Sequence, residues 1–437
     1  MRGTGLILNA VYLLLVLVGL PWFAWVAWRK GKYREGYGEK LLGRVPRRRS
    51  NRPCLWLHAV SVGEVNLLAP LLRVIARQCP DCECVISTTT HTGMKLARKK
   101  YPEYTVFYCP LDFTWAVAAA MRRVRPDVLV LTELELWPNL IRAARRHGAR
   151  VAIINGRLSE HSFRGYRRIR FLLRRVLRQI DLIAVQDATY AERFLALGAR
   201  PETVQTTGSM KYDGARTDRN NPATRRMAEL AGFGPDDVVF LAGSTQEGEE
   251  AAALEAFSQL AQRFSRLRLI LVPRHPERFD AVGRLLDQSG VAWVRRSHLP
   301  DASADSGEAA ARVLLVDTVG ELGAWWGTAH IAFVGGSLGS RGGQNMIEPA
   351  AYGAAVSFGP NTRNFRDIVA SLLACDAAVV VANRDELTAF VRRCLEEPDW
   401  AEQLGRRAQE HVCRQLGATE RTVDLLVRLR SLGIPCA

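Results

Sequence analysis

Residues 330–353, HIAFVGGSLGSRGGQNMIEPAAYG, decide how this sequence is to be interpreted. The apolar run Ile331–Val334 predicts a buried strand, and five glycines follow it before Asn345. A predicted helix then begins and carries Glu348 in its first turn. A strand, a glycine-rich turn and a helix N-terminus together present backbone N–H groups to a phosphate. The stretch therefore predicts an α/β fold with a nucleotide whose ribose meets Glu348; the alternative is a tight turn without a ligand.

The length and charge of the chain narrow its class. At 437 residues it is long enough for two domains. Its 60 Lys and Arg against 44 Asp and Glu give a formal net charge of +16. Such a surface attracts nucleic acid, anionic lipid or a phosphorylated substrate, and composition does not choose among them. Cys79, Cys82 and Cys84 form a cluster without a second ligand pair for zinc, so we expect reduced thiols.

The amino terminus predicts a membrane anchor. Residues 6–28 are almost all apolar and would extend roughly 34 Å as a helix, which is enough for a bilayer core. Four basic residues follow between Arg29 and Arg34, whereas only Arg2 precedes the run. The positive-inside rule then puts the remaining chain at the cytoplasmic face of the inner membrane. A cleaved signal peptide is the rival, and a helix lying in the interface is a variant.

From residue 53 onward, short apolar runs alternate with helical patterns, which predicts parallel sheets with helices on both faces. The expected strands cover residues 54–58, 84–88, 104–109, 128–131, 151–154 and 182–185, and then 238–242, 267–272, 291–294, 313–316, 331–334 and 355–358. The polar residues 212–222 predict a linker. We therefore expect an anchor with its basic flank (1–35) and two doubly wound Rossmann-like domains facing a cleft (36–212 and 213–437). The last helix, residues 419–432, could pack on either domain.

Polar side chains follow the predicted strands of the first half. Glu64 lies where the first strand turns into a helix, so it is a candidate general base. A helix N-terminus favours the ionised carboxylate and weakens such a base, and the alternative is a first-turn Glu that only complements the helix dipole. Glu133 and Glu135 follow the strand at residues 128–131, and an extended backbone would put both on one face. Lys211 lies just before the linker and is expected to face the cleft.

The second half repeats this placement. Arg274 stands between two prolines after a strand and suits a phosphate or carboxylate through paired N–H donors. Gly320 and Glu321 follow a later strand, and Glu348 follows the glycine-rich turn. Carboxyl ends of parallel strands meet at one edge of a sheet, where ligands of this fold class bind. The coincidence of several such clusters carries more weight than any single one.

Residues 164–179 are different, because seven arginines surround apolar residues at helical spacing. A basic amphipathic helix of this kind binds an anionic membrane or an anionic substrate. The alternative is an ordinary solvated helix face.

The ordered segments HAVSVGEV, STTTHTG, PLD, TELELWPNL, NGRLS, GSMKYD, AGSTQEGEE, PRHPER, VGEL, FVGGSLGSRGGQNMIEPAAYG and NFRDI resemble the Kdo (3-deoxy-D-manno-octulosonic acid) transferases of lipopolysaccharide biosynthesis. These are glycosyltransferases of the GT-B fold, and the resemblance, hydrophobic amino terminus included, covers essentially the whole chain. It implies transfer of Kdo from the donor CMP-Kdo to the tetraacyldisaccharide bisphosphate precursor of lipid A, with inversion and without a cofactor.

The resemblance also implies roles for individual residues. Glu64 matches the catalytic base, and Lys211 with one of Glu133 or Glu135 matches residues that stabilise the transition state. The two glutamates stay equivalent, because the family has Glu-Thr-Glu-Leu-Trp-Pro where this chain has Glu-Leu-Glu-Leu-Trp-Pro. The segments that match CMP contacts contain Pro273, Arg274, Val319, Gly320, Glu321, Asn345, Met346, Ile347 and Glu348.

With CMP held by these donors, leaving-group stabilisation needs no metal, and no Asp-x-Asp pair follows a strand. We expect an anionic inner-membrane surface and a lipid A precursor as partners, and no nucleic acid. Two alternatives remain. A nucleotide-sugar epimerase or another GT-B transferase would share the fold, and a membrane-tethered nucleic-acid-binding protein would need aromatic side chains among its arginines.

Overall fold

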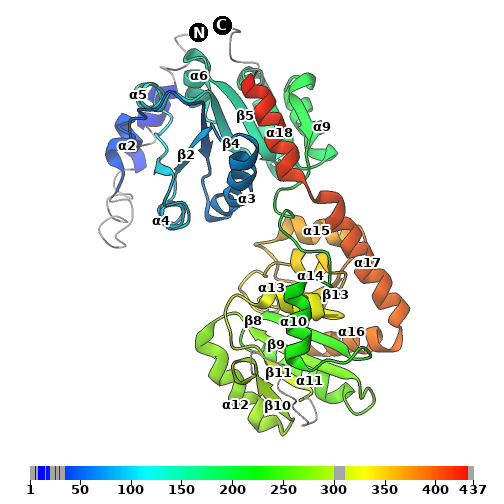
Figure 1. Ribbon diagram of the computed structural model, residues 1–437. Helices are drawn as coiled ribbons and strands as arrows, with labels where there is room; N and C mark the ends of the chain where they lie inside the picture. The colour runs from blue at the N-terminus through cyan, green and yellow to red at the C-terminus, as the bar shows by residue number, and fades with distance from the viewer. Residues whose placement is uncertain are drawn as a thin grey trace. The chain divides into compact units, whose positions relative to one another are not determined.

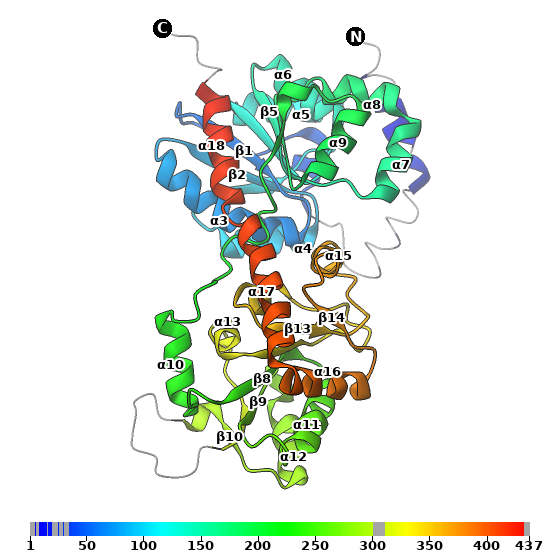
Figure 2. The same cartoon turned by 90° about the vertical axis from the view of Figure 1, so that its right-hand side faces the viewer.

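The computed structural model describes residues 35–299 and 311–431, together with residues 5, 8–14, 16–19, 25 and 29. It divides into two compact units (Figures 1 and 2). Unit 1 comprises Met1–Asp213 and Gln415–Ala437, and unit 2 comprises Gly214–Arg414. The chain therefore passes from unit 1 to unit 2 within the predicted linker, and the last helix belongs to unit 1.

Unit 1 is built on a parallel sheet with the strand order β3-β2-β1-β4-β5-β6-β7. Its strands are β1 Cys54–His58, β2 Glu83–Thr88, β3 Thr105–Tyr108, β4 Val128–Thr132, β5 Arg150–Gly156, β6 Leu182–Val185 and β7 Val204–Thr206. The first six were expected, because strands buried on both faces of a parallel sheet are continuous apolar runs. Strand β7 was not predicted, because it has only three residues, two of them polar and exposed.

The helices of unit 1 are α2 Tyr37–Leu42, α3 Val62–Gln78, α4 His91–Lys100, α5 Thr114–Val124, α6 Pro138–Arg146, α7 Glu160–Arg168, α8 Arg170–Leu177, α9 Ala188–Leu197 and α18 Ala418–Ser431. Helix α18 packs beside α3 (Figure 1) and buries Val423 and Leu426 in the same apolar cluster as Leu68. This packing puts the amphipathic carboxyl terminus on the sheet of unit 1.

One helix expected over the arginine-rich segment is wrong. The structure has two helices, α7 and α8, with a break at Ile169 (φ −111°, ψ 23°). Helix α7 buries none of its side chains, whereas α8 buries Leu173 and Leu177. Leu173 and Leu177 of α8 are therefore buried in the core of unit 1, whereas Phe163 and Tyr166 of α7 pack against the same core but are only partly buried.

Unit 2 contains a second parallel sheet, with the order β10-β11-β9-β8-β12-β13-β14. Its strands are β8 Val238–Thr245, β9 Leu267–Pro273, β10 Trp293–Arg295, β11 Val313–Leu315, β12 Ile331–Val334, β13 Ala355–Phe358 and β14 Val379–Val380. Its helices are α10 Pro222–Ala231, α11 Glu249–Leu260, α12 Phe279–Ser289, α13 Leu322–Trp325, α14 Ile347–Ala351, α15 Arg366–Ala374, α16 Arg384–Glu396 and α17 Pro398–Gln415, the last residue of which is assigned to unit 1. Helices α11 and α16 lie side by side on this sheet (Figure 2).

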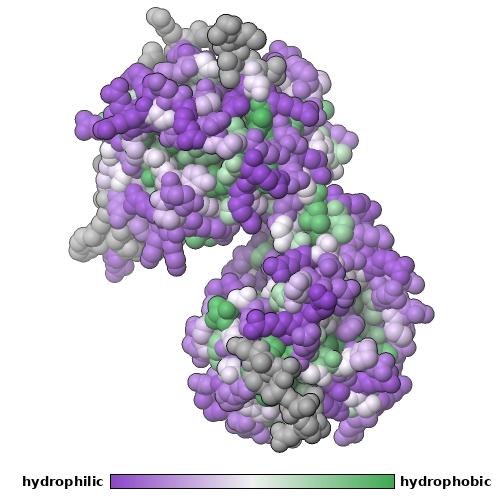
Figure 3. Space-filling view, in the orientation of Figure 1, coloured by the Kyte–Doolittle hydropathy of each residue, from purple (hydrophilic) through white to green (hydrophobic). Residues whose placement is uncertain are grey.

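Hydrophilic residues cover most of the face of the two units that Figure 3 draws.

Two further expectations concern the ends of the chain and its thiols. Within the described residues, no helix is both long and apolar enough to cross a bilayer. Much of the expected anchor, with Lys32, Arg34 and Arg2 beside it, lies outside the described residues. Reduced thiols are wrong for Cys79 and Cys82, which form a disulfide, since the end of α3 brings their Cα atoms to 5.5 Å.

Candidate active site

The site in unit 1 lies where the strand order reverses. Strands β1 and β4 are neighbours, although two further strands separate them in the chain. At such a switch point the connections leave to opposite sides and expose the carboxyl ends of both strands. His58 ends β1, Thr132 ends β4, and α3 begins a few residues after β1.

Glu64 occupies this switch point and is 7% exposed. It forms a capping box with Ser61, whose hydroxyl accepts from the Glu64 N–H while the Glu64 carboxylate accepts from the Ser61 N–H (3.2 Å). The carboxylate also accepts from the Val60 N–H (2.9 Å) and the Ser61 hydroxyl (2.8 Å), and the Thr132 hydroxyl is a further partner. These donors fill the acceptor positions of a carboxylate. A base at Glu64 must therefore exchange a hydroxyl partner for the substrate.

His58 is buried beside this carboxylate. Its Nδ1 lies 2.9 Å from the Ser87 hydroxyl, and its Nε2 is buried and has no hydrogen-bond partner among the described residues. Burial lowers its pKa to about 4, although the charge of Glu64 acts in the opposite direction. The imidazole is therefore neutral at neutral pH and adds no positive charge to the site.

Glu133 and Lys211, both predicted as site residues, lie together in the structure. The Lys211 Nζ is 3.5 Å from one Glu133 oxygen, and the Arg157 Nε is 3.1 Å from the other. The expected extended backbone at Glu133 is wrong, because β4 ends at Thr132 and Glu133 has a left-handed φ of 54°. That turn directs the carboxylate to the two cations, and the 21% exposure of its side chain leaves the group accessible.

Glu135 takes a different environment two residues later. Its carboxylate accepts a hydrogen bond from the Trp137 indole N–H at 2.9 Å. Burial raises its pKa, the Trp137 hydrogen bond opposes the shift, and the negative charges of Glu64 and Glu133 add to it. The structure thus separates the two glutamates that the sequence left equivalent: Glu133 is paired with cations, and Glu135 is packed near like charges.

In unit 2, the first part of the glycine-rich turn has its N–H groups occupied, contrary to the expected phosphate cradle. The N–H groups of Gly336, Ser337 and Leu338 donate to the carboxylate of Glu249, at 2.6, 2.9 and 2.9 Å. The Gln246 N–H donates to the same carboxylate at 2.8 Å. Glu249 is 2% exposed. The expected phosphate cradle is wrong for these residues, because a carboxylate of the chain itself occupies the anion position.

The predicted Gly320, Glu321 and Glu348 line one cavity of about 590 Å³, with three arginines. Arg296 holds Glu321 through two hydrogen bonds of 3.1 Å. Asn345 donates to Glu348 at 3.0 Å. Burial raises the pKa of Glu348, and Asn345 and the charge of the exposed Arg274 oppose that shift. The other two arginines of the lining are Arg216 and Arg226.

The remaining residues predicted to contact the nucleotide differ in how exposed they are. Val319 is 79% exposed beside Gly320, and Pro273 is the last residue of β9. Met346 and Ile347 are buried, so only their backbone could meet a ligand. The helix expected to begin at residue 345 begins instead at Ile347.

Several important residues were absent from the predicted set. Arg157 and Thr132 stand beside predicted residues but carry no pattern of their own, and Glu249 acts on a turn far away in the chain. One signal was available, because Ser61-x-x-Glu64 is the sequence of a capping box. Among the described residues, no group of His, Cys, Asp and Glu is arranged to hold a metal ion.

Comparisons with known proteins show which proteins this chain resembles. A family model described as 3-deoxy-D-manno-octulosonic-acid transferase (kdotransferase) matches residues 35–214. The 3-deoxy-D-manno-octulosonic acid transferase of Haemophilus influenzae is 34% identical over 377 residues, which cover 85% of this chain and 86% of that protein. Its namesake from Bordetella pertussis is 33% identical over 430 residues, covering 94% and 97%.

The UDP-GlcNAc 2-epimerase of Neisseria meningitidis, solved bound to UDP-GlcNAc, has a similar fold with a TM-score of 0.53. It covers 86% of this chain and 100% of that chain at 12% identity, so the likeness concerns the fold alone. Two parallel α/β sheets with polar clusters at their carboxyl edges, together with these relatives, define a glycosyltransferase of the GT-B fold. The chain belongs to the 3-deoxy-D-manno-octulosonic acid transferase family.

Proposed function

We propose that this transferase moves Kdo from CMP-Kdo to the tetraacyldisaccharide bisphosphate precursor of lipid A, with inversion and without a metal ion. The observation that carries the proposal is the switch-point carboxylate Glu64, which is buried and hydrogen-bonded to the hydroxyl groups of Ser61 and Thr132. A hydroxyl of the acceptor would take the place of the Ser61 or Thr132 hydroxyl on this carboxylate. Glu64 then accepts its proton as the oxygen attacks the anomeric carbon, and a single displacement inverts that centre.

Unit 2 supplies the nucleotide site in this proposal. CMP occupies the cavity lined by Glu321 and Glu348, with the ribose hydroxyls near Glu348. The phosphate is held by Arg274 and the arginines of the cavity rather than by the turn that Glu249 fills. Fixed positive charge near the departing phosphate stabilises the leaving CMP. Lys211, held by Glu133, is proposed to stabilise the transition state.

The test is Glu64→Gln, assayed with CMP-Kdo and lipid A precursor. Gln keeps the size of the side chain but cannot accept the proton, so we expect kcat to fall at least about 100-fold while CMP binding is unchanged. Glu103→Gln, at an exposed position of unit 1, is the control. Turnover of Glu64→Gln within a few-fold of wild type would overturn the assignment of the base. Loss of activity in EDTA would overturn metal independence, and turnover of a UDP-sugar without acceptor would favour an epimerase.

We propose that the amino terminus and the arginine-rich helices hold the enzyme on the cytoplasmic face of the inner membrane. The Asn9 side chain donates to the Thr114 hydroxyl at 2.7 Å and accepts the Thr114 N–H at 3.1 Å. Leu14, Leu17 and Val18 are 61%, 64% and 73% exposed, which suits an apolar surface in contact with lipid.

The break between α7 and α8 adds a second such surface. Phe171 is 66% exposed amid the arginines of both helices, so the segment offers an apolar side chain within a basic surface. Replacing Arg167, Arg168, Arg174 and Arg175 by Glu should raise KM for the lipid acceptor and leave CMP binding unchanged. Unchanged acceptor kinetics would mean that these helices only face solvent.

A further inference from the structure

Unit 2 contains a second cavity, of about 660 Å³, which the proposed reaction does not use. Its lining includes the first residues of three strands, Val238 of β8, Leu267 of β9 and Ile331 of β12. It therefore lies at the amino-terminal edge of the sheet, whereas the proposed nucleotide site follows the carboxyl ends of the strands. We call it the amino-edge cavity. Its volume is in the range of small-molecule sites.

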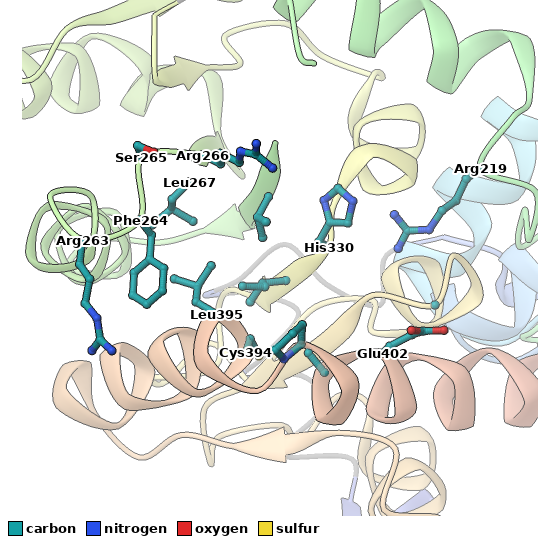
Figure 4. A pocket seen from close by; sticks show the side chains of 15 residues that line it. Arg219, Arg263, Phe264, Ser265, Arg266, Leu267, His330, Cys394, Leu395 and Glu402 are labelled. Carbon is teal, nitrogen blue, oxygen red and sulfur yellow. The ribbon is translucent and has the colours of Figure 1, made fainter. Parts of the chain in front are cut away.

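The two ends of the amino-edge cavity differ in chemistry (Figure 4). Phe264 and Leu395 lie toward one end, with Cys394 beside them. The side chains of Arg219 and His330 lie toward the other end together with the carboxylate of Glu402, and Arg263 lies near Phe264. One end thus favours an apolar group, and the other favours an anion or a hydrogen-bond acceptor.

Arg219 carries a charge that no carboxylate of the described residues balances. Its Nε donates to the Tyr352 carbonyl at 2.6 Å and its Nη1 to the Gly327 carbonyl at 3.3 Å. Burial lowers its pKa, which shows how far the guanidinium is removed from water. Backbone carbonyls orient the group without neutralising it, and an anion that reaches it gains a charge-assisted hydrogen bond.

The other charged groups of the lining are already paired. Arg263 contacts Glu396 at 2.5 Å, and Arg266 contacts Asp236 at 3.3 Å. Glu402, the acidic residue of the lining, pairs with Arg406 at 2.6 Å. The uncompensated charge of the cavity is therefore concentrated at Arg219.

His330 provides a neutral donor beside that charge. Its Nδ1 accepts the Val239 N–H at 3.1 Å, so the ring proton must be on Nε2. Burial and the charge of Arg219 lower its pKa to about 4, with Asp237 acting in the opposite direction. The ring therefore offers an N–H group at neutral pH without adding a second positive charge.

We propose that the amino-edge cavity binds an amphipathic carboxylate, with its carboxylate on Arg219 and the Nε2–H of His330 and its alkyl chain along Phe264 and Leu395. The inference stands apart from the proposed sugar transfer, because none of these residues lines the nucleotide cavity. A single uncompensated cation with a neutral donor suits a monocarboxylate, and the apolar end needs a chain to cover it.

The test is calorimetric titration of the full-length protein with decanoate. Acetate supplies the charge without the chain, and 1-decanol supplies the chain without the charge. We expect decanoate to bind at least about 10-fold more tightly than either, since 1-decanol lacks the charge-assisted hydrogen bond and acetate lacks the buried alkyl chain, and each accounts for at least that factor. Equal binding of acetate or of 1-decanol, or no binding of decanoate, would overturn the proposal.

Amino-acid substitutions in the amino-edge cavity test whether decanoate binds there. Arg219→Gln removes the charge and should weaken decanoate at least about 10-fold. Because Arg219 also supports two backbone carbonyls, Ala401→Phe provides an independent test by filling the cavity from α17 without touching that arginine. Arg284→Gln, an exposed change on α12, is the matched control. Decanoate affinity that survives in Ala401→Phe would place the ligand elsewhere and refute the inference.

Discussion

Glu249 should be a major source of stability in unit 2, and Glu249→Gln tests this. Each carboxylate oxygen accepts two backbone N–H groups, from Gln246 and Gly336 on one oxygen and from Ser337 and Leu338 on the other. Glutamine turns one oxygen into an NH₂ donor, so in either orientation two N–H groups lose their acceptor.

The magnitude follows from those two groups. A hydrogen bond to a charged group contributes about 1.5–3 kcal/mol, so two give about 3–6 kcal/mol before relaxation of the turn, and we expect a loss of about 3 kcal/mol. For a unit of this size that lowers Tm by roughly 6–12 °C. The assay is scanning calorimetry, in which the transition of unit 2 should move while that of unit 1 stays in place.

The control is Glu255→Gln on the same helix. Glu255 is 3.4 Å from Arg384 at the surface, and such a pair contributes less than about 1 kcal/mol. A Glu249→Gln transition within about 1 kcal/mol of wild type, or equal to that of Glu255→Gln, would falsify the view that this carboxylate organises the turn.

Two further predictions concern the same switch points. Gly335→Ala should destabilise unit 2 by about 1–3 kcal/mol in urea unfolding, because its Cβ would lie 2.6 Å from the Thr245 Cα, whereas Gly339→Ala, with open space around it, should be nearly neutral. The pKa of His58 is lowered to about 4 in the folded protein, so the free energy of unfolding should decrease as the pH falls from 7 to 5. Over this interval His58 is protonated in the unfolded chain, where its pKa is near 6.5, but stays neutral in the folded chain. That group contributes about 2 kcal/mol over this interval, so His58→Gln should flatten the pH dependence of the free energy of unfolding. An equal change in the exposed His161→Gln would contradict the assignment to His58.

The sheets were predictable from local sequence. Fully buried parallel strands are continuous apolar runs, and Cys54–His58, Leu182–Val185 and Ile331–Val334 were predicted to the residue. Strand β14, like β7, was not predicted, because its two residues are too few to show a hydrophobic periodicity. The family resemblance supplied the enzyme class, which hydrophobic patterning alone does not contain.

The sequence predicted which residues belong to the site better than it predicted how they are arranged. Glu133 and Lys211 were named from strand ends, yet their pairing depends on a left-handed backbone at a non-glycine residue. Arg157 could not be found in this way, because its role follows from where β5 ends relative to β4. Long-range pairing of this kind is set by the tertiary structure, and neither spacing nor propensity encodes it.

In both units a carboxylate of the chain occupies the anion position at the switch point, and this bears on where the proposed nucleotide phosphate binds. In each unit the helix that follows the first strand begins at the switch point, where N–H groups favour an anion. Glu64 fills that position in unit 1 and Glu249 fills it in unit 2, each with at least two backbone N–H groups. The two carboxylates differ in their other hydrogen-bond partners within the described residues: hydroxyl groups donate to Glu64, whereas the donors to Glu249 are all backbone N–H groups. Hydroxyl partners can rotate away and backbone donors cannot, which supports the proposal that Glu64, rather than Glu249, exchanges one of its partners for the acceptor hydroxyl. In the proposed reaction the phosphate therefore depends on arginine side chains instead of the N–H groups of Gly336, Ser337 and Leu338, which bind Glu249 within their own unit.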